Sequence, residues 1–161
     1  MSFLLWLELT RIGTFVRESE SLLGYPTFST LHTIGLAIIV GLSTVVAVRL
    51  LGFAPTMRLV PLKKLFPIMW FGFAINTFSG SGLAAAAATQ TIPDPMFIAK
   101  ITCVLGAVVI LRVLQVRVFR DSELGNKPLD ATNKFLAGSL LCLWLLAMIT
   151  GRVIAYKFFE G

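Results

Sequence analysis

The sequence predicts an all-α integral membrane protein, in which an N-terminal amphipathic interfacial helix precedes a membrane four-helix bundle. Of its 161 residues, 57% are hydrophobic and only 14% are charged, whereas about a quarter of the residues of a soluble globular domain are charged. The mean hydropathy is +0.86. Because a membrane-spanning helix needs roughly 20 apolar residues, the length allows about four spans, and we expect a single membrane domain over residues 1–161.

The N-terminal segment, residues 2–20, has the pattern of an amphipathic helix. Its apolar residues recur at helical spacing: Leu5, Leu9, Ile12 and Val16. We expect this helix to lie in the membrane interface, with Trp6 as an anchor. A cleaved signal peptide is the alternative interpretation, but Glu8 and Arg11 interrupt the apolar stretch that such a peptide requires.

Four apolar segments follow, each long enough to cross a bilayer. They cover about residues 26–51, 65–88, 96–119 and 131–156. Pro26 stands at the start of the first segment and Pro67 in the first turn of the second, where a missing backbone N–H costs a helix little. Lipid offers no hydrogen-bond partners to the backbone, so we expect each segment to be helical.

The basic residues predict the orientation. The first-to-second and third-to-fourth connections hold most of them: Arg49, Arg58, Lys63, Lys64, Arg117, Arg120, Lys127 and Lys134. The other side holds fewer: Arg11, Arg17 and Lys157. The positive-inside rule therefore predicts a multi-pass protein of the bacterial inner (cytoplasmic) membrane with both termini on the periplasmic side. We expect no nucleic-acid partner, because the chain has no soluble basic domain.

Ionisable residues within the spans are candidates for function, because each costs about 2.5 to 3.5 kcal/mol on insertion scales. Three of them fall within roughly 6 to 9 Å of the outer boundary at the helical rise. These are His32, Lys100 and Arg152. The second span places Asn76 and Ser79 on one side, with Ser79 nearest that level, and Tyr156 shares a helix face with Arg152. An acidic residue of the N-terminal segment, Glu8, Glu18 or Glu20, could neutralise the cations from above.

The remaining polar and reactive residues within the spans are expected to be structural. Arg112 lies close enough to the cytoplasmic end of the third span to extend toward the headgroups. Cys103 and Cys142 have no metal-binding spacing, so apolar packing is their expected role. The alanine run at residues 84–88 is expected to be a close-packing surface.

The residues near the outer face suit a b-type haem. Haem iron takes a neutral imidazole as an axial ligand, its propionates favour cations, and its ring needs an apolar slot between helices. We therefore expect haem b or a similar porphyrin, with His32 on the iron and Lys100 and Arg152 holding acidic groups. The second axial position would be open, filled by Lys100 or a methionine, or supplied by another molecule. The expected role is electron transfer or substrate oxidation with quinone as acceptor, and whether the chain is an enzyme stays open.

Two other functions remain open. Lys100 and Arg152 could extend to water while His32 forms a hydrogen bond between helices, in a cofactor-free structural or accessory subunit. With or without haem, we expect the lipid bilayer as a partner, together with copies of the chain or a larger membrane complex. Copper or anion transport is a third possibility, less favoured because copper takes several thiolate, thioether or imidazole ligands.

Nearly the whole chain resembles an uncharacterised family of small four-span bacterial membrane proteins, described only as a domain of unknown function. The matching stretches are LHTIGLAIIVGLSTVVAVRLLG, the W-x-G-F of residues 70–73, DPMFIAKITCVLG and GRVIAY. More distantly, the first and third spans are similar to HemJ-type membrane protoporphyrinogen oxidase. The first span, in which a histidine is followed by a glycine-containing apolar run, is also similar to the CopD family of membrane proteins. In the HemJ family a histidine and a lysine of these spans are functional and haem b is bound. That resemblance implies His32 as haem ligand and Lys100 near the propionates or substrate.

Overall fold

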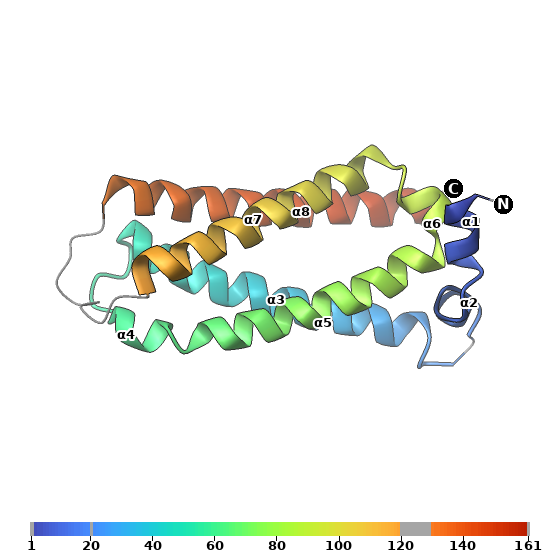
Figure 1. Cartoon of the computed structure of the whole chain (residues 1–161), viewed down its shortest axis with the longest axis horizontal. Helices are drawn as coiled ribbons and strands as arrows, with labels where there is room; N and C mark the ends of the chain where they lie inside the picture. Colours follow the sequence, from blue (N-terminus) through green and yellow to red (C-terminus); the bar gives the residue numbers. More distant parts are fainter. Residues whose placement is uncertain (1, 20, 120–129, 161) are drawn as a thin grey trace.

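The computed structural model describes residues 2–19, 21–119 and 130–160, and this part of the chain contains helices and no strand. The predicted all-α class is confirmed. In order along the chain (Figure 1), the helices are α1 Phe3–Glu8, α2 Arg11–Glu18, α3 Tyr25–Leu51, α4 Leu59–Leu62, α5 Leu65–Ala86, α6 Ala88–Thr91, α7 Pro95–Phe119 and α8 Ala131–Glu160.

Three of the described helices are long and apolar enough to cross a membrane. They are α3, α7 and the Ala131–Lys157 part of α8. The second predicted span is also helical, but α5 lies outside this group. It has 22 residues, and its Asn76, Ser79 and Ser81 lower the hydropathy of its second half. The structure thus confirms an apolar helical protein suited to a membrane.

The boundaries of the long helices follow local signals. Pro26 occupies the first turn of α3. At the other end Gly52 has a φ of 96°, and its N–H and that of Phe53 bond to the carbonyls of Arg49 and Val48 at 3.2 Å each. This left-handed cap stops the helix because glycine has no Cβ to clash there. Helix α5 ends at Ala86, earlier than predicted, and the chain turns at Ala87 before α6.

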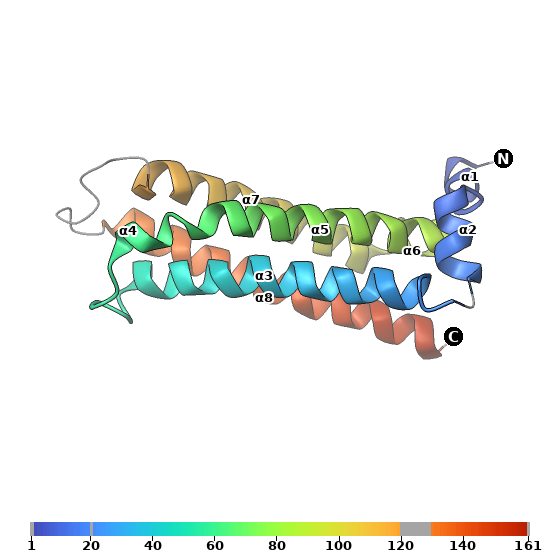
Figure 2. The ribbon, with the colours of Figure 1, turned by 90° about the horizontal axis from the view of Figure 1, so that it is seen from below.

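The single N-terminal helix predicted over residues 2–20 is wrong, because the chain forms two short helices there. The break has a local cause: the Thr10 side chain accepts a hydrogen bond from the Gly13 N–H at 3.3 Å and begins α2 anew. Of the predicted apolar stripe only Val16 is buried, whereas Leu5, Leu9 and Ile12 are exposed. Helices α1 and α2 lie across the end of the long helices where both chain termini lie (Figures 1 and 2).

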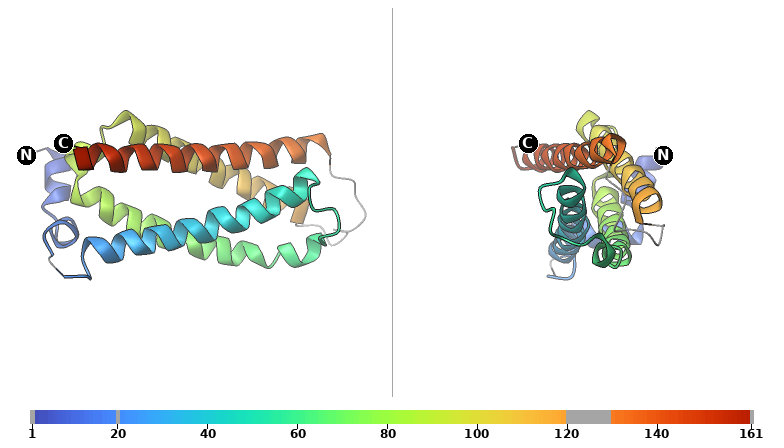
Figure 3. Two further views of the ribbon diagram at one scale, coloured as in Figure 1. Left: turned by 180° about the vertical axis from the view of Figure 1, so that it is seen from behind. Right: turned by 90° about the vertical axis from the view of Figure 1, so that its left-hand side faces the viewer.

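The four long helices pack mainly as two pairs, α3 with α5 and α7 with α8, and α3 also contacts α8 (Figure 3). We call the end with α1, α2 and α6 the terminal end, and the end with α4 the loop end. On α7 every buried residue lies from Ala107 onward, and none lies within residues 95–106. The shared hydrophobic core is therefore concentrated toward the loop end, and the inner side of α7 is only partly covered toward the terminal end.

Candidate functional site

His32 joins α3 to α5 through two reciprocal hydrogen bonds. Its Nδ1 lies 3.0 Å from the backbone carbonyl oxygen of Asn76, and the Asn76 side-chain amide donates to the backbone carbonyl of His32 at 2.9 Å. A carbonyl oxygen only accepts, so Nδ1 carries the ring proton in this contact. In the neutral imidazole the second nitrogen, Nε2, is then left with its lone pair.

Close approach of the two helices makes these bonds possible. A Cβ added to Gly35 would lie 2.6 Å from the backbone nitrogen of Asn76, and one added to Gly80 would lie 2.9 Å from Cε1 of His32. The buried Ser79 completes the contact, since its hydroxyl lies 3.4 Å from Nδ1 of His32 and donates to the Ile75 carbonyl at 2.7 Å. The structure therefore brings the predicted His32, Asn76 and Ser79 together.

Lys100 approaches from the other helix pair. It is half-buried, and its Cε and Nζ atoms each lie 3.4 Å from the position that a Cβ would take on Gly151 of α8. The sequence analysis did not single out Gly151, and its signal was only a small residue next to Arg152.

Arg152 and Tyr156 lie on an exposed face of α8. The Arg152 guanidinium carbon is 5.6 Å from the centroid of the Tyr156 ring, a cation–π contact within one helix. The structure thus pairs these two residues with each other, and their part in binding a cofactor stays a prediction.

Two turns deeper than His32 and Lys100, the core begins. Residues seven positions away lie on the same helix faces, about 10 Å along the axis. These are Ile39 on α3, Ala107 on α7 and, relative to Gly151, Trp144 on α8, all at most 2% exposed. The Trp144 indole N–H has no hydrogen-bond partner in the described part of the protein. Buried apolar residues thus lie two turns below His32 and Lys100, and they include the unpaired indole N–H of Trp144.

The two described acidic residues named as possible partners of the cations, Glu8 and Glu18, bond to other groups of the protein. The Glu8 carboxylate accepts hydrogen bonds from the hydroxyl of Thr89 at 2.7 Å and from its backbone N–H at 2.8 Å. These bonds, the side-chain one foremost, hold the pKa of Glu8 below its ordinary value of 4.5, and the charge of Arg17 adds to the effect. Glu18 pairs with Arg17 at 2.9 Å, and Glu20 lies outside the described residues. The bonds between Glu8 and Thr89 fasten α1 to α6.

A second ion pair fastens the terminal end. The Lys157 ammonium donates to the carboxylate of Asp94 at 2.9 Å, which connects the end of α8 to the start of α7. The same carboxylate accepts from the Met96 N–H at 2.7 Å. The hydrogen bond from Lys157, followed by that from Met96, lowers the pKa of Asp94.

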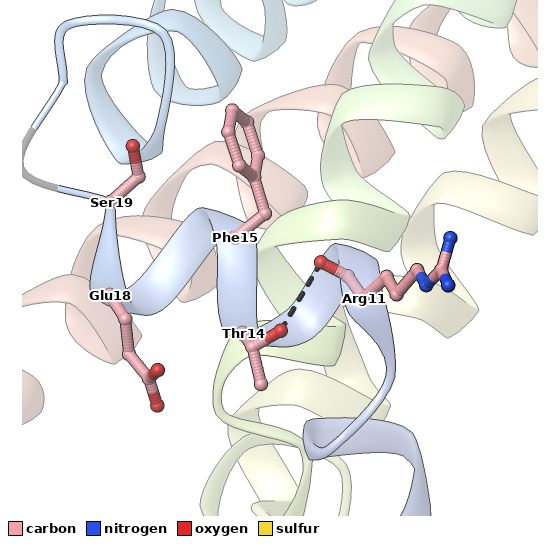
Figure 4. Close-up of a pocket in the computed structure, with 5 residues that line it drawn as sticks. All are labelled: Arg11, Thr14, Phe15, Glu18 and Ser19. Carbon is pink, nitrogen blue, oxygen red and sulfur yellow. Dashed lines mark hydrogen bonds between the residues drawn. The ribbon is translucent and has the colours of Figure 1, made fainter.

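One surface depression lies away from these residues. It is an open hollow on α2 and the residue that follows it, lined by Arg11, Thr14, Phe15, Glu18 and Ser19 (Figure 4). The Thr14 hydroxyl lies 3.3 Å from the Arg11 carbonyl. The hollow contains none of the predicted site residues.

The described residues offer no cluster of three or more His, Cys, Asp and Glu side chains that could hold a metal ion. Comparisons with models of protein families, with curated proteins and with solved structures find no match to this chain.

Proposed function

We propose that this chain is an integral membrane protein that binds b-type haem or a similar porphyrin near its outer face, with His32 as axial ligand. One observation carries the proposal, the hydrogen bond from Nδ1 of His32 to the Asn76 carbonyl at 3.0 Å. Histidines that bind metals almost always donate their other ring N–H to a carbonyl, a carboxylate or water, which orients the ring and raises its basicity. His32 has this arrangement.

The surroundings of His32 fit such a group. Lys100 supplies a cation from the opposite helix pair, suited to a propionate, and Arg152 offers a second one at the exposed surface. The inner side of α7 near Lys100 is half-covered, and Trp144 holds an unpaired N–H beneath it. A bound haem would supply one-electron redox chemistry. The role we propose is electron transfer, or oxidation of a substrate with quinone as acceptor.

We place this site in a four-span bundle with both termini on the periplasmic side of the bacterial inner membrane, as the basic residues predict. Two features support this placement. Helix α5 runs beside the apolar α3, and both chain ends lie at the terminal end (Figure 1).

Absorption spectra of the detergent-purified protein, oxidised and dithionite-reduced, test the proposal. We expect a Soret band in the wild type, its loss in His32→Ala, and its return when that variant is supplied with imidazole. Asn76→Ala is the matched control, because it removes the bond to the His32 backbone but keeps the carbonyl that orients the ring. A colourless, folded wild type from haem-replete cells, or an equal Soret band in His32→Ala, contradicts the proposal.

A second candidate is a cofactor-free structural or accessory subunit that assembles with copies of itself or a larger complex. The observation that favours it is the same pair of reciprocal bonds, since His32 and Asn76 fasten α3 to α5 directly. In that case His32→Ala and Asn76→Ala would both lower the unfolding temperature and neither would change a spectrum. Copper or anion transport, the third candidate, gains no cluster of metal donors from the described residues.

A further inference from the structure

Arg112 is an exposed arginine within one of the three apolar helices. It stands seven residues before the last residue of α7, about 10 Å along the helix axis. A guanidinium at this depth is costly in hydrocarbon unless it reaches the interface or meets an anion. The question is what the guanidinium contacts.

The protein holds this side chain in one direction. The Arg112 Nη1 atom donates to the side-chain oxygen of Gln115 at 2.8 Å, and the Trp70 indole of α5 donates to the same oxygen at 3.2 Å. Gln115 lies one turn nearer the helix end, so the guanidinium is directed toward the headgroup level. The contact uses one of five N–H donors, and an arginine fixed in this way retains the fork that binds phosphate oxygens in pairs.

An exposed apolar track adjoins Arg112 on α7. Leu105 and Val109, which are 57% and 60% exposed, precede Arg112 by seven and three residues and so share its helix face. Both lie deeper in the apolar part of the helix than Arg112. A phosphate at the guanidinium would therefore place an acyl chain along these two side chains, where its burial is favourable.

The charge at the loop end suits an anion. The described cations of this end are Arg49, Arg58, Lys63, Lys64, Arg117 and Lys134. The described carboxylate near them is that of Asp130, 3.9 Å from Arg117. Basic groups beside membrane helices attract anionic lipids of the cytoplasmic leaflet.

We propose that an anionic phospholipid binds at Arg112, with its phosphate on the guanidinium fixed by Gln115 and Trp70 and a chain along Val109 and Leu105. The site rests on α7 spanning a membrane and is independent of the haem proposal. It would also stabilise the contact of α5 with α7, which includes the Trp70–Gln115 bond and the packing of Phe66 on Phe119, whose ring centroids are 5.0 Å apart.

The test measures the unfolding temperature of the detergent-purified full chain with added phosphatidylglycerol, phosphatidylcholine or inorganic phosphate. We expect phosphatidylglycerol alone to raise it by about 2–4 °C in the wild type, as a bound ligand does by mass action. Arg112→Gln should lose this rise. Lys63→Gln, which removes one positive charge just after α4 at the same end, should keep it.

Gln115→Leu provides a second variant, which retains the cation and loses the oxygen that fixes it, and we expect several-fold weaker phosphatidylglycerol binding by native mass spectrometry. An equal rise in Arg112→Gln, or a loss as large in Lys63→Gln, overturns the site. An equal rise with phosphatidylcholine shows that the headgroup charge is irrelevant, and one with phosphate alone assigns the site to a free anion. Either result overturns the lipid proposal.

Discussion

Replacing Gly35 by alanine should force α3 and α5 apart. The added Cβ would lie 2.6 Å from the Asn76 nitrogen and 2.8 Å from the Gly72 carbonyl oxygen. Both are backbone atoms of α5, so no side chain can move aside, and the helices must separate by about 0.8 Å to restore an ordinary contact of about 3.4 Å. Overpacking of this kind costs up to about 3 kcal/mol, and the better helix propensity of alanine returns about 1 kcal/mol. We expect a net loss of about 2 kcal/mol, which corresponds to a fall in unfolding temperature of about 4–8 °C.

Gly41→Ala is the matched control, because Gly41 lies on the same helix and has no atom within 4 Å of an added Cβ. Here only the propensity gain of about 1 kcal/mol applies, so the unfolding temperature should stay level or rise. Thermal unfolding of both variants in the same detergent measures the difference. If Gly35→Ala were as stable as Gly41→Ala, the close α3–α5 contact that positions His32 would be refuted.

Two further predictions concern the terminal end. Gly151→Leu should displace the Lys100 side chain, which lies 3.4 Å from the position of an added Cβ, and should reduce any Soret absorbance. The control is Gly138→Leu, because nothing lies within 4 Å of an added Cβ at Gly138. Equal absorbance in the two variants would show that Lys100 is not needed for binding. Because folding lowers the pKa of Glu8 from 4.5, its ionised form should stabilise the protein above pH 4.5, and this contribution should be lost as the pH falls through the lowered pKa. Glu8→Gln should therefore unfold at a lower temperature than the wild type at pH 7 and at nearly the same temperature in acid. Replacement of the exposed Glu18 by glutamine serves as control. If the difference in unfolding temperature between Glu8→Gln and the wild type did not depend on pH, the assigned role of the carboxylate would be contradicted.

The helices could be predicted wherever local physics decides the outcome. Long apolar runs become helical because lipid leaves the backbone no other partners, and Gly52 ends α3 through a conformation that glycine adopts readily. The break between α1 and α2 also has a local cause, the Thr10 cap, but the place where this segment attaches to the rest of the protein could not be predicted locally. Its carboxylate at Glu8 bonds to Thr89, 81 residues away in the sequence, and this contact fastens the end of α1 to α6 just before Thr10 begins α2.

The candidate site could be predicted only in part. Spacing showed which residues share a helix face, and the apolar setting of His32 marked it as unusual. Helix rotation, however, is set by packing against neighbouring helices. That packing exposes Arg152 on α8 and directs Lys100 across Gly151. Neither result can be predicted from which residues share a face of one helix.

By itself, the sequence determined that this chain is helical and apolar, with a few ionisable side chains within its long helices, because composition and periodicity act locally. The tertiary structure decided what those side chains do. The clearest case is His32, whose Nδ1 carries the proton because the Asn76 carbonyl, 44 residues away in the chain, lies 3.0 Å from it. That distance depends on glycines on both helices that let two backbones approach, and no single segment specifies it.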